Sequence, residues 1–257
     1  MNIVVCLKQT FDTEAKIVLG SNGKIDNAGV NLVMNPYDEF AVEEALKLRE
    51  KFGGQVTLVS MGGDRVTESL RTALAMGCDE AVLINDPSLE SPDEWVTAEI
   101  LAKAIAQMPY DMILAGRIAV DDGSSQVAVR VADALNIPSV SCILKLEVED
   151  GMASVTREID GGTELIQVSL PVVLTAQKGL NIPRYPSMMG IMKAKKKEIK
   201  ILTLADLGLN AADLPRKMSI TKYNLPSPRK GGKKVPGEAA DAARELAKLL
   251  REEAKVI

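Results

Sequence analysis

Short apolar runs alternate with amphipathic stretches over the first 140 residues of the chain. The apolar runs are rich in Val, Ile and Leu and have the length of buried strands. They cover residues 3–7, 55–60, 81–84 and 111–115. Strands that alternate with helices in this way form βαβ units, so the pattern predicts an α/β fold. We expect a mostly parallel sheet with helices on both faces.

The amphipathic stretches between these runs carry helix start and stop signals. The first combines an Asn N-cap with a proline at the first helical position, and it runs to about Phe52 before Gly53-Gly54. The second is predicted to end near Gly77, and the fourth before Pro138. The start signals of the four helices are Asn35-Pro36, Asp64, Pro92-Asp93-Glu94 and Gly123-Ser124-Ser125.

The pattern changes after residue 143. Apolar and polar residues alternate over residues 144–149, 153–158 and 165–170, and the turns between them are Asp150-Gly151 and Asp160-Gly161-Gly162. Such turns are typical of hairpins, so we expect an antiparallel excursion at an edge of the same sheet. Residues 171–176 then return to a buried strand.

Regular periodicity ends near Gly179, where prolines become frequent. Residues 184–234 hold thirteen Lys/Arg and three Asp/Glu, a net charge of +10, whereas the whole chain has a net charge of -4. Such a segment has too little apolar surface to pack on itself, so we expect it to lie extended along an acidic partner. A final helix is predicted over residues 238–255. We therefore divide the chain into an α/β domain, 1–183, and a contact region, 184–257.

Composition narrows the possible chemistry. The chain is 46% hydrophobic and 26% charged, as in ordinary globular proteins, and no apolar run reaches the ~20 residues of a membrane span. It has no histidine, which excludes His-based acid–base catalysis and Ser-His or Cys-His nucleophiles. Cys6, Cys78 and Cys142 are widely spaced, and we expect buried thiols. The first residues form a strand with no presequence before it, so we expect a cytoplasmic protein without membrane insertion.

Polar residues cluster where the predicted parallel strands end. Ligands of such sheets bind at this edge, and the segments that reach it are 6–9, 35–38, 61–64 and 116–126. In the last segment, backbone N–H groups and the hydroxyls of Ser124 and Ser125 could hold a phosphate at the positive end of a helix. The alternative is an ordinary capped loop with Asp121 and Asp122 in its turns. The standard dinucleotide and P-loop fingerprints do not occur, so neither is the source of nucleotide binding.

Several long motifs, in a fixed order, resemble one family. VTREIDGG at 155–162 and LPVVLTA at 170–176 are similar to the signature of electron-transfer flavoprotein beta subunits. NIPRYPS at 181–187 and GIMKAKKK at 190–197 resemble the partner-recognition loop of that family and the basic run after it. MNPYD at 34–38, AVEEA at 41–45 and LRTALAMG at 70–77 match further segments, so the resemblance spans essentially the whole chain.

The resemblance implies a fold of the adenine nucleotide alpha hydrolase type and a heterodimer. The alpha subunit carries a redox-active FAD that the beta subunit helps to hold, and the beta subunit binds AMP structurally. Tyr37 lies where the family places an aromatic residue near the flavin, and Phe11 and Asp12 lie near the cleft between the subunits. The implied AMP-binding residues are Cys6, Asn35, Pro36, Tyr37, Asp38, Met61, Gly116, Asp121, Gly123, Ser124, Ser125, Gln126 and Val127.

The resemblance also implies partners for the contact region. These are the alpha subunit, an acyl-CoA dehydrogenase-type donor of fatty acid beta-oxidation and a quinone oxidoreductase acceptor. The sequence departs from the family at Met188, where Leu is common, and at Thr13, where some members have an aromatic residue over the flavin. Nucleic acid is disfavoured, because the basic segment has few aromatic residues. The implied docking residues are Arg184, Tyr185, Met188, Lys193, Lys195 and Lys196.

Three hypotheses follow. The first is an electron-carrier subunit, not an enzyme, that binds AMP and passes electrons from an acyl-CoA dehydrogenase toward the quinone pool. The second is the beta subunit of a flavin-bifurcating relative, in which a second FAD replaces AMP. The third is a stand-alone ATP-binding enzyme of related fold, against which the lack of a P-loop and of histidine counts.

Overall fold

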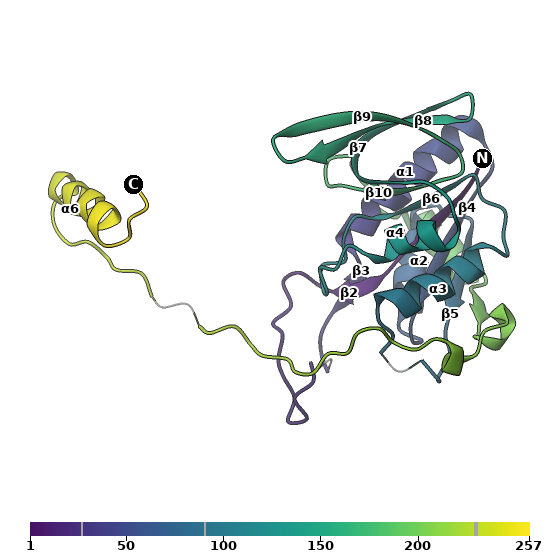
Figure 1. The fold of residues 1–257 in the computed structure, drawn as a ribbon, viewed down its shortest axis with the longest axis horizontal. Helices are drawn as coiled ribbons and strands as arrows, with labels where there is room; N and C mark the ends of the chain where they lie inside the picture. Colours follow the sequence, from purple (N-terminus) through teal and green to yellow (C-terminus); the bar gives the residue numbers. More distant parts are fainter. Residues whose placement is uncertain (27, 90, 229–230) are drawn as a thin grey trace. The chain divides into compact units, whose positions relative to one another are not determined.

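The computed structural model describes residues 1–26, 28–89, 91–228 and 231–257. It divides into two compact units, Met1–Ile17 with Asp26–Thr221, and Val18–Ile25 with Lys222–Ile257. The first unit contains the sheet (Figure 1). The predicted boundary between residues 183 and 184 concerns contact with a partner and stays a prediction.

A nine-stranded sheet forms the centre of the first unit, and in the described residues only the end of it that is made of β7 (Ser139–Glu149), β8 (Met152–Ile159) and β9 (Gly162–Ser169) is antiparallel. A two-stranded antiparallel pair, β2 and β3, follows β1 in the chain. The order across the large sheet is β11 (Lys200–Leu202), β5 (Glu80–Ile84), β4 (Gln55–Met61), β1 (Asn2–Cys6), β6 (Met112–Gly116), β10 (Val172–Ala176), β7 (Ser139–Glu149), β8 (Met152–Ile159) and β9 (Gly162–Ser169). The small pair is β2 (Gln9–Phe11) and β3 (Leu32–Met34).

Helices cover both faces of the parallel part of the sheet (Figure 1). Residues of β1 alternate between the faces: Ile3 and Val5 pack with α1 (Pro36–Phe52) and α2 (Val66–Met76), while Val4 and Cys6 pack with α3 (Glu94–Ile105) and α4 (Val127–Ala134). This alternation is the period-2 geometry of a strand that is buried on both sides. The helices are α1 (Pro36–Phe52), α2 (Val66–Met76), α3 (Glu94–Ile105), α4 (Val127–Ala134), α5 (Met188–Lys196) and α6 (Ala239–Glu252), with 3-10 turns η1 (Ala205–Leu207) and η2 (Ala211–Asp213).

The predicted α/β architecture and its antiparallel excursion are confirmed, whereas two helix starts were wrong. Asp64 does not cap α2, because its side chain accepts a hydrogen bond from Asn85 and the N-cap position is Arg65. The fourth helix begins at Val127, two residues after the end of the predicted start signal Gly123-Ser124-Ser125, and its N-cap residue is Gln126. By contrast, Asp93 does cap α3, through a 2.9 Å bond from the Val96 amide.

The segment from residue 184 was also predicted incorrectly, because α5, β11 and two 3-10 turns interrupt the expected extended chain. The Ser187 hydroxyl caps α5, and Ala194 of this helix is buried in the core. Arg229 and Lys230 of the predicted basic segment lie outside the described residues. Of the three thiols expected to be buried, Cys142 is only half-buried.

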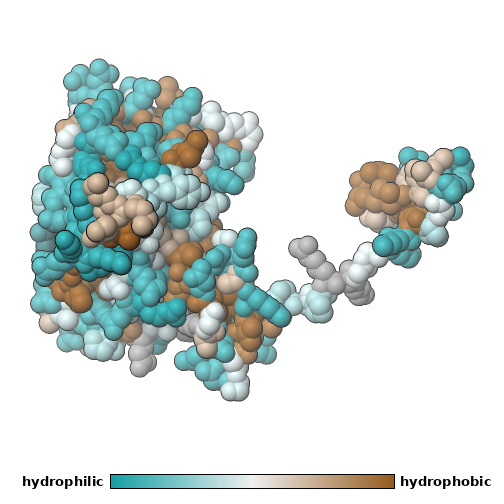
Figure 2. Space-filling model, turned by 180° about the vertical axis from the view of Figure 1, so that it is seen from behind, coloured by the Kyte–Doolittle hydropathy of each residue, from teal (hydrophilic) through white to brown (hydrophobic). Residues whose placement is uncertain are grey.

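The second unit carries apolar side chains on its surface. None of the α6 residues is buried in the described structure, and Leu246 on this helix is 47% exposed. Figure 2 shows apolar side chains on the surface of this unit. Among the residues that the structure describes, no helix is long and apolar enough to cross a membrane.

The central strands should dominate stability. Leu114 in β6 is fully buried, whereas Leu165 in β9 is 77% exposed. We expect Leu114→Ala to lower the free energy of unfolding by about 2–5 kcal/mol, because it leaves a cavity in a packed core. Leu165→Ala is the matched control and should change it by less than about 0.5 kcal/mol. Urea denaturation measures both, and equal effects would contradict the assignment of the core.

Candidate functional site

The candidate site lies at the carboxyl ends of β1, β4 and β6. β1 is flanked by β4 on one side and β6 on the other. The chain first adds β4 and β5 on one side of β1, and after α3 it crosses to the other side and forms β6. The strand order therefore reverses between β1 and β6. Open α/β sheets bind ligands at such a position, outside the strand ends.

Asp38, in the first turn of α1, joins three separate segments at this position. Its Oδ2 accepts a 2.7 Å hydrogen bond from the Lys8 amide after β1. Its Oδ1 accepts bonds from the Gly116 amide at the end of β6, at 3.0 Å, and from Asn35 Nδ2, at 2.9 Å. The side chain is nearly inaccessible, with the residue 4% exposed. One buried carboxylate thus sets the separation of the loops after β1 and β6.

Asn35 extends this network into the loop after β6. Its Nδ2 donates to the Ile118 carbonyl at 2.9 Å, and its Oδ1 accepts from the Val120 amide at 3.2 Å. Asn35 occupies the N-cap position of α1 as predicted, but its side chain makes no capping hydrogen bond. The side-chain amide instead bonds residues 118 and 120 of the loop after β6.

Gly116 has no room for a side chain. A Cβ atom there would lie 2.3 Å from Asp38 Oδ1 and 2.7 Å from Tyr37 Cβ. Both neighbours belong to the first turn of α1, so any larger residue would push α1 away from β6. The close approach of backbone and carboxylate therefore requires glycine.

Burial determines the protonation of Asp38 and Cys6. Desolvation raises the pKa of Asp38 to about 7, although its hydrogen bonds from Lys8, Asn35 and Gly116 act in the opposite direction. Desolvation, followed by the charge of Asp38, raises the pKa of the Cys6 thiol to about 12. Cys6 therefore stays protonated at neutral pH and is a poor nucleophile.

The loop after β6 has the backbone geometry of an anion site. Gly123 and Ser125 have positive φ angles of 67° and 54°, and α4 begins two residues after Ser125. Left-handed residues beside right-handed ones point successive N–H groups into a common concavity. Within the described residues, the Ser125 and Gln126 amides have no hydrogen-bond acceptor. These donors stand at the positive end of α4 and suit a phosphate oxygen.

Lys8 lies in the predicted segment 6–9, but the sequence did not indicate that its side chain takes part in the site. Its Nζ forms ion pairs with Asp121 Oδ1 at 2.8 Å and Asp122 Oδ2 at 2.6 Å. Asp122 Oδ1 in turn accepts from the Ser124 amide at 2.8 Å. Burial lowers the pKa of Lys8, but its bonds to the two carboxylates outweigh this and raise the pKa above its usual value. Lys8 offsets the charge of two carboxylates that would otherwise repel an anion.

The remaining predicted residues also lie at the strand ends or beside them. Tyr37 packs under the Arg117 guanidinium, whose carbon lies 5.6 Å from the ring centre. Gln126 is the N-cap residue of α4, and its side chain accepts from Arg130. Pro36 is the first residue of α1, Met61 the last of β4, Cys6 the last of β1 and Val127 the first of α4. In the described part of the chain, no group of three or more His, Cys, Asp or Glu is placed to hold a metal ion.

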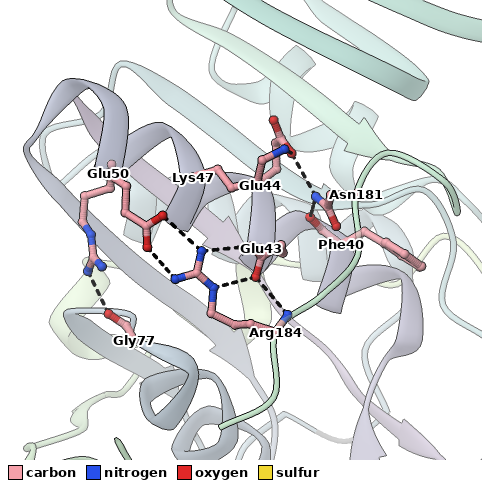
Figure 3. Close-up of polar contacts among 9 residues, drawn as sticks. Phe40, Glu43, Glu44, Lys47, Glu50, Gly77, Asn181 and Arg184 are labelled. Atoms are coloured by element: carbon pink, nitrogen blue, oxygen red, sulfur yellow. Dashed lines mark hydrogen bonds and ion pairs between the residues drawn. The ribbon is translucent and has the colours of Figure 1, made fainter. Parts of the chain in front are cut away.

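The predicted docking residues form a second region, around α5. Tyr185 is 94% exposed and Met188 is 79% exposed. Lys193, Lys195 and Lys196 lie in the last turn of α5. Arg184 differs from the others because its guanidinium is bonded to two carboxylates of α1 (Figure 3).

Comparison with known proteins identifies the family of the chain. Residues 22–207 match the model of the electron transfer flavoprotein domain. An electron transfer flavoprotein subunit beta of Bacillus subtilis (strain 168) is 48% identical over 258 residues, covering 100% of both chains. The same subunit of Syntrophomonas wolfei is 44% identical over 257 residues, covering 100% of this chain and 98% of the relative. The caffeyl-CoA reductase-Etf complex subunit CarD of Acetobacterium woodii is 38% identical over 236 residues, covering 90% of each.

The raised pKa of Asp38 predicts a pH-dependent stability. The folded chain binds this proton more tightly than the unfolded chain, in which an Asp titrates near pH ~4. Unfolding therefore releases a proton, and the contribution of Asp38 to stability falls as the pH rises from about 4 to about 7.

Urea denaturation of the wild type and of Asp38→Asn at pH 5, 6, 7 and 8 measures this dependence. The wild type should lose stability relative to the variant over this range, and most of the loss should be complete by pH 8. A stability difference that is independent of pH would contradict the account.

Proposed function

This chain belongs to the electron transfer flavoprotein family as a beta subunit, and we propose that it binds AMP at the strand ends of its sheet. In this proposal the nucleotide has a structural role. The chain pairs with an alpha subunit, helps to hold the FAD of that subunit and docks an acyl-CoA dehydrogenase-type donor. FAD, when bound, supplies the redox chemistry, and the residues of this chain bind the nucleotide and orient the partners.

The observation that carries the nucleotide assignment is the turn at Gly123–Gln126, with its positive φ angles at Gly123 and Ser125. The amides of Ser125 and Gln126, which have no acceptor among the described residues, and the hydroxyls of Ser124 and Ser125 are donors of the kind that hold a phosphate. Asn35 holds the loop that leads to this turn at Val120, and Asp38 holds the end of β1 through the Lys8 amide. The adenosine part would then extend over Cys6, Met61 and Gly116, the last residues of β1, β4 and β6.

We propose docking through the apolar and basic residues of α5 and the segment before it. Tyr185 and Met188 offer exposed apolar surface, and a flexible thioether adapts to pockets of different shape. Lys193, Lys195 and Lys196 add positive charge beside them, which would steer an acidic partner. Arg184, bonded to α1, contributes by holding this surface.

A second candidate function is favoured by one relative. The Acetobacterium woodii protein is named as a subunit of a caffeyl-CoA reductase-Etf complex, which differs from an acyl-CoA dehydrogenase partner. In the corresponding proposal a second FAD occupies the same strand-end site, and its AMP moiety uses the same donors. The chain would then take part in flavin bifurcation.

The composition of the purified heterodimer separates the two candidates. We expect denaturation to release one FAD and one AMP per dimer, because the donors around Ser125 suit one phosphate group. Chromatography of the released nucleotides against standards, with the flavin absorbance, gives both counts. Two FAD and no AMP would overturn the AMP assignment in favour of the second candidate, and the absence of any adenine nucleotide beyond one FAD would overturn both.

A further inference from the structure

The segment just before the exposed docking residues is attached to α1. Two residues of this segment, Asn181 and Arg184, contact acidic side chains of the helix (Figure 3). Asn181 Nδ2 donates to Glu44 Oε2 and to the Phe40 carbonyl, both at 2.9 Å. Lys47 balances the charge of Glu44 at 3.2 Å.

Arg184 makes the larger set of contacts. Its Nε and Nη2 donate to the two oxygens of Glu43, at 2.8 and 2.9 Å, and its backbone amide donates to Glu43 Oε2 at 3.0 Å. Its Nη1 and Nη2 also donate to the two oxygens of Glu50, at 2.5 and 3.2 Å. The guanidinium is thus held in two bidentate pairs by carboxylates that are two helical turns apart.

The contact between Arg184 and Glu43 is largely buried, so neither side chain can exchange its partner for water without a cost in free energy. The Glu43 side chain is 7% exposed and that of Arg184 is 34% exposed, whereas Glu50 is 51% exposed. The hydrogen bonds to Glu43 and then Glu50 raise the pKa of Arg184, and the bond from Arg184 lowers the pKa of Glu50. Removing the arginine would leave the buried Glu43 carboxylate without its partner, which is costly, so the chain has one preferred path across α1.

The other end of the same surface is fastened to α2. Arg71 in α2 donates to the carbonyls of Ala194 and Lys197, at the end of α5. Gly190 lies so close to α2 that a Cβ would be 2.2 Å from the Ala75 carbonyl oxygen. Lys197 Nζ donates to the Cys78 carbonyl at 2.5 Å.

Exposed apolar side chains lie between these two attachments. Tyr185 follows Arg184 directly, and no other large hydrophobic side chain of the described residues is more exposed. We call residues 182–192 the docking segment. Its exposed large apolar residues are Ile182 at 90%, Tyr185 at 94%, Met188 at 79%, Met189 at 66%, Ile191 at 39% and Met192 at 66%. A segment that exposes so much apolar surface would collapse or move unless it were held.

We propose that Arg184 is a positioning residue for electron transfer: through Glu43 and Glu50 it holds the docking segment in its binding geometry before the donor arrives. The inference rests on the proposed docking function. A segment that is already ordered binds its partner without losing further conformational entropy, so the anchor increases affinity without touching the donor. It acts on docking and leaves the flavin site alone.

The test uses the heterodimer with its FAD, and medium-chain acyl-CoA dehydrogenase with octanoyl-CoA as the electron donor. For Arg184→Met we expect the KM for the flavoprotein to rise about tenfold, the effect of having to order one further residue on binding. The kcat and the bound flavin should change less than about twofold. Amides of residues 185–192 should exchange with deuterium faster in the variant, which reports the anchor independently of the donor.

Related variants separate positioning from a general loss of stability. Arg184→Lys retains one charge without the paired geometry and should restore part of the KM, whereas Glu43→Gln combined with Arg184→Met should add little to the single change. Arg49→Met is the matched control, because Arg49 lies in α1 itself and its Nη1 pairs with Asp79 at 2.9 Å, not with the docking segment. It should lower the melting temperature and leave the KM unchanged. Glu50→Gln removes only the more exposed pair and serves if Arg184→Met does not fold, with a smaller rise in KM expected.

Met188→Ala separates the anchoring role of Arg184 from the docking function of the segment. It changes an exposed contact residue and should raise the KM without faster exchange in residues 185–192. If Met188→Ala raises the KM and Arg184→Met does not, the anchoring role is wrong. If neither variant changes the KM, the docking function itself is wrong and the inference falls with it.

Discussion

The strand-end site depends on a buried carboxylate that accepts hydrogen bonds from three parts of the chain. Asp38 receives amides from the ends of β1 and β6 and the side chain of Asn35, so the two loops that flank the candidate site cannot move apart independently. Gly116 permits the required approach, because any side chain there would occupy the space of the carboxylate. The cost of burying this charge appears as its raised pKa. The buried carboxylate fixes the positions of the loops after β1 and β6, which is the role expected of a residue that shapes a binding site.

Helix α1, which holds this carboxylate in its first turn, also supports the docking segment. α1 presents Asp38 in its first turn to the strand ends, and Glu43 and Glu50 further along to Arg184. One rigid element therefore carries the network that shapes the proposed nucleotide site and the attachment of the proposed docking segment. In the proposed function, this arrangement would give the bound nucleotide a structural role, since a ligand that stabilises the first turn of α1 also stabilises the helix to which the docking segment is attached.

Sequence patterns predicted the sheet, because strands buried on both faces form short apolar runs, and they predicted which strand ends meet at the candidate site. They did not reveal how the polar side chains pair. Asn35 carries a capping signature, but its side chain bonds the loop after β6, and Lys8 had no local signal because its carboxylate partners are more than a hundred residues away. α5 was missed because prolines and lysines surround it, while its stability comes from contact with α2. In each case a tertiary contact outweighed a local preference.

Hydrogen exchange of the nucleotide-free heterodimer, with and without added AMP, tests the central claim most directly. The account predicts that AMP slows exchange in residues 6–9, 34–38, 61–64 and 116–127, because the proposed ligand contacts these segments and the Asp38 network joins them. Strands distant from the site, such as β8 and β9, should exchange at the same rate in both samples. Protection confined to other segments, or no protection at saturating AMP, would contradict the account.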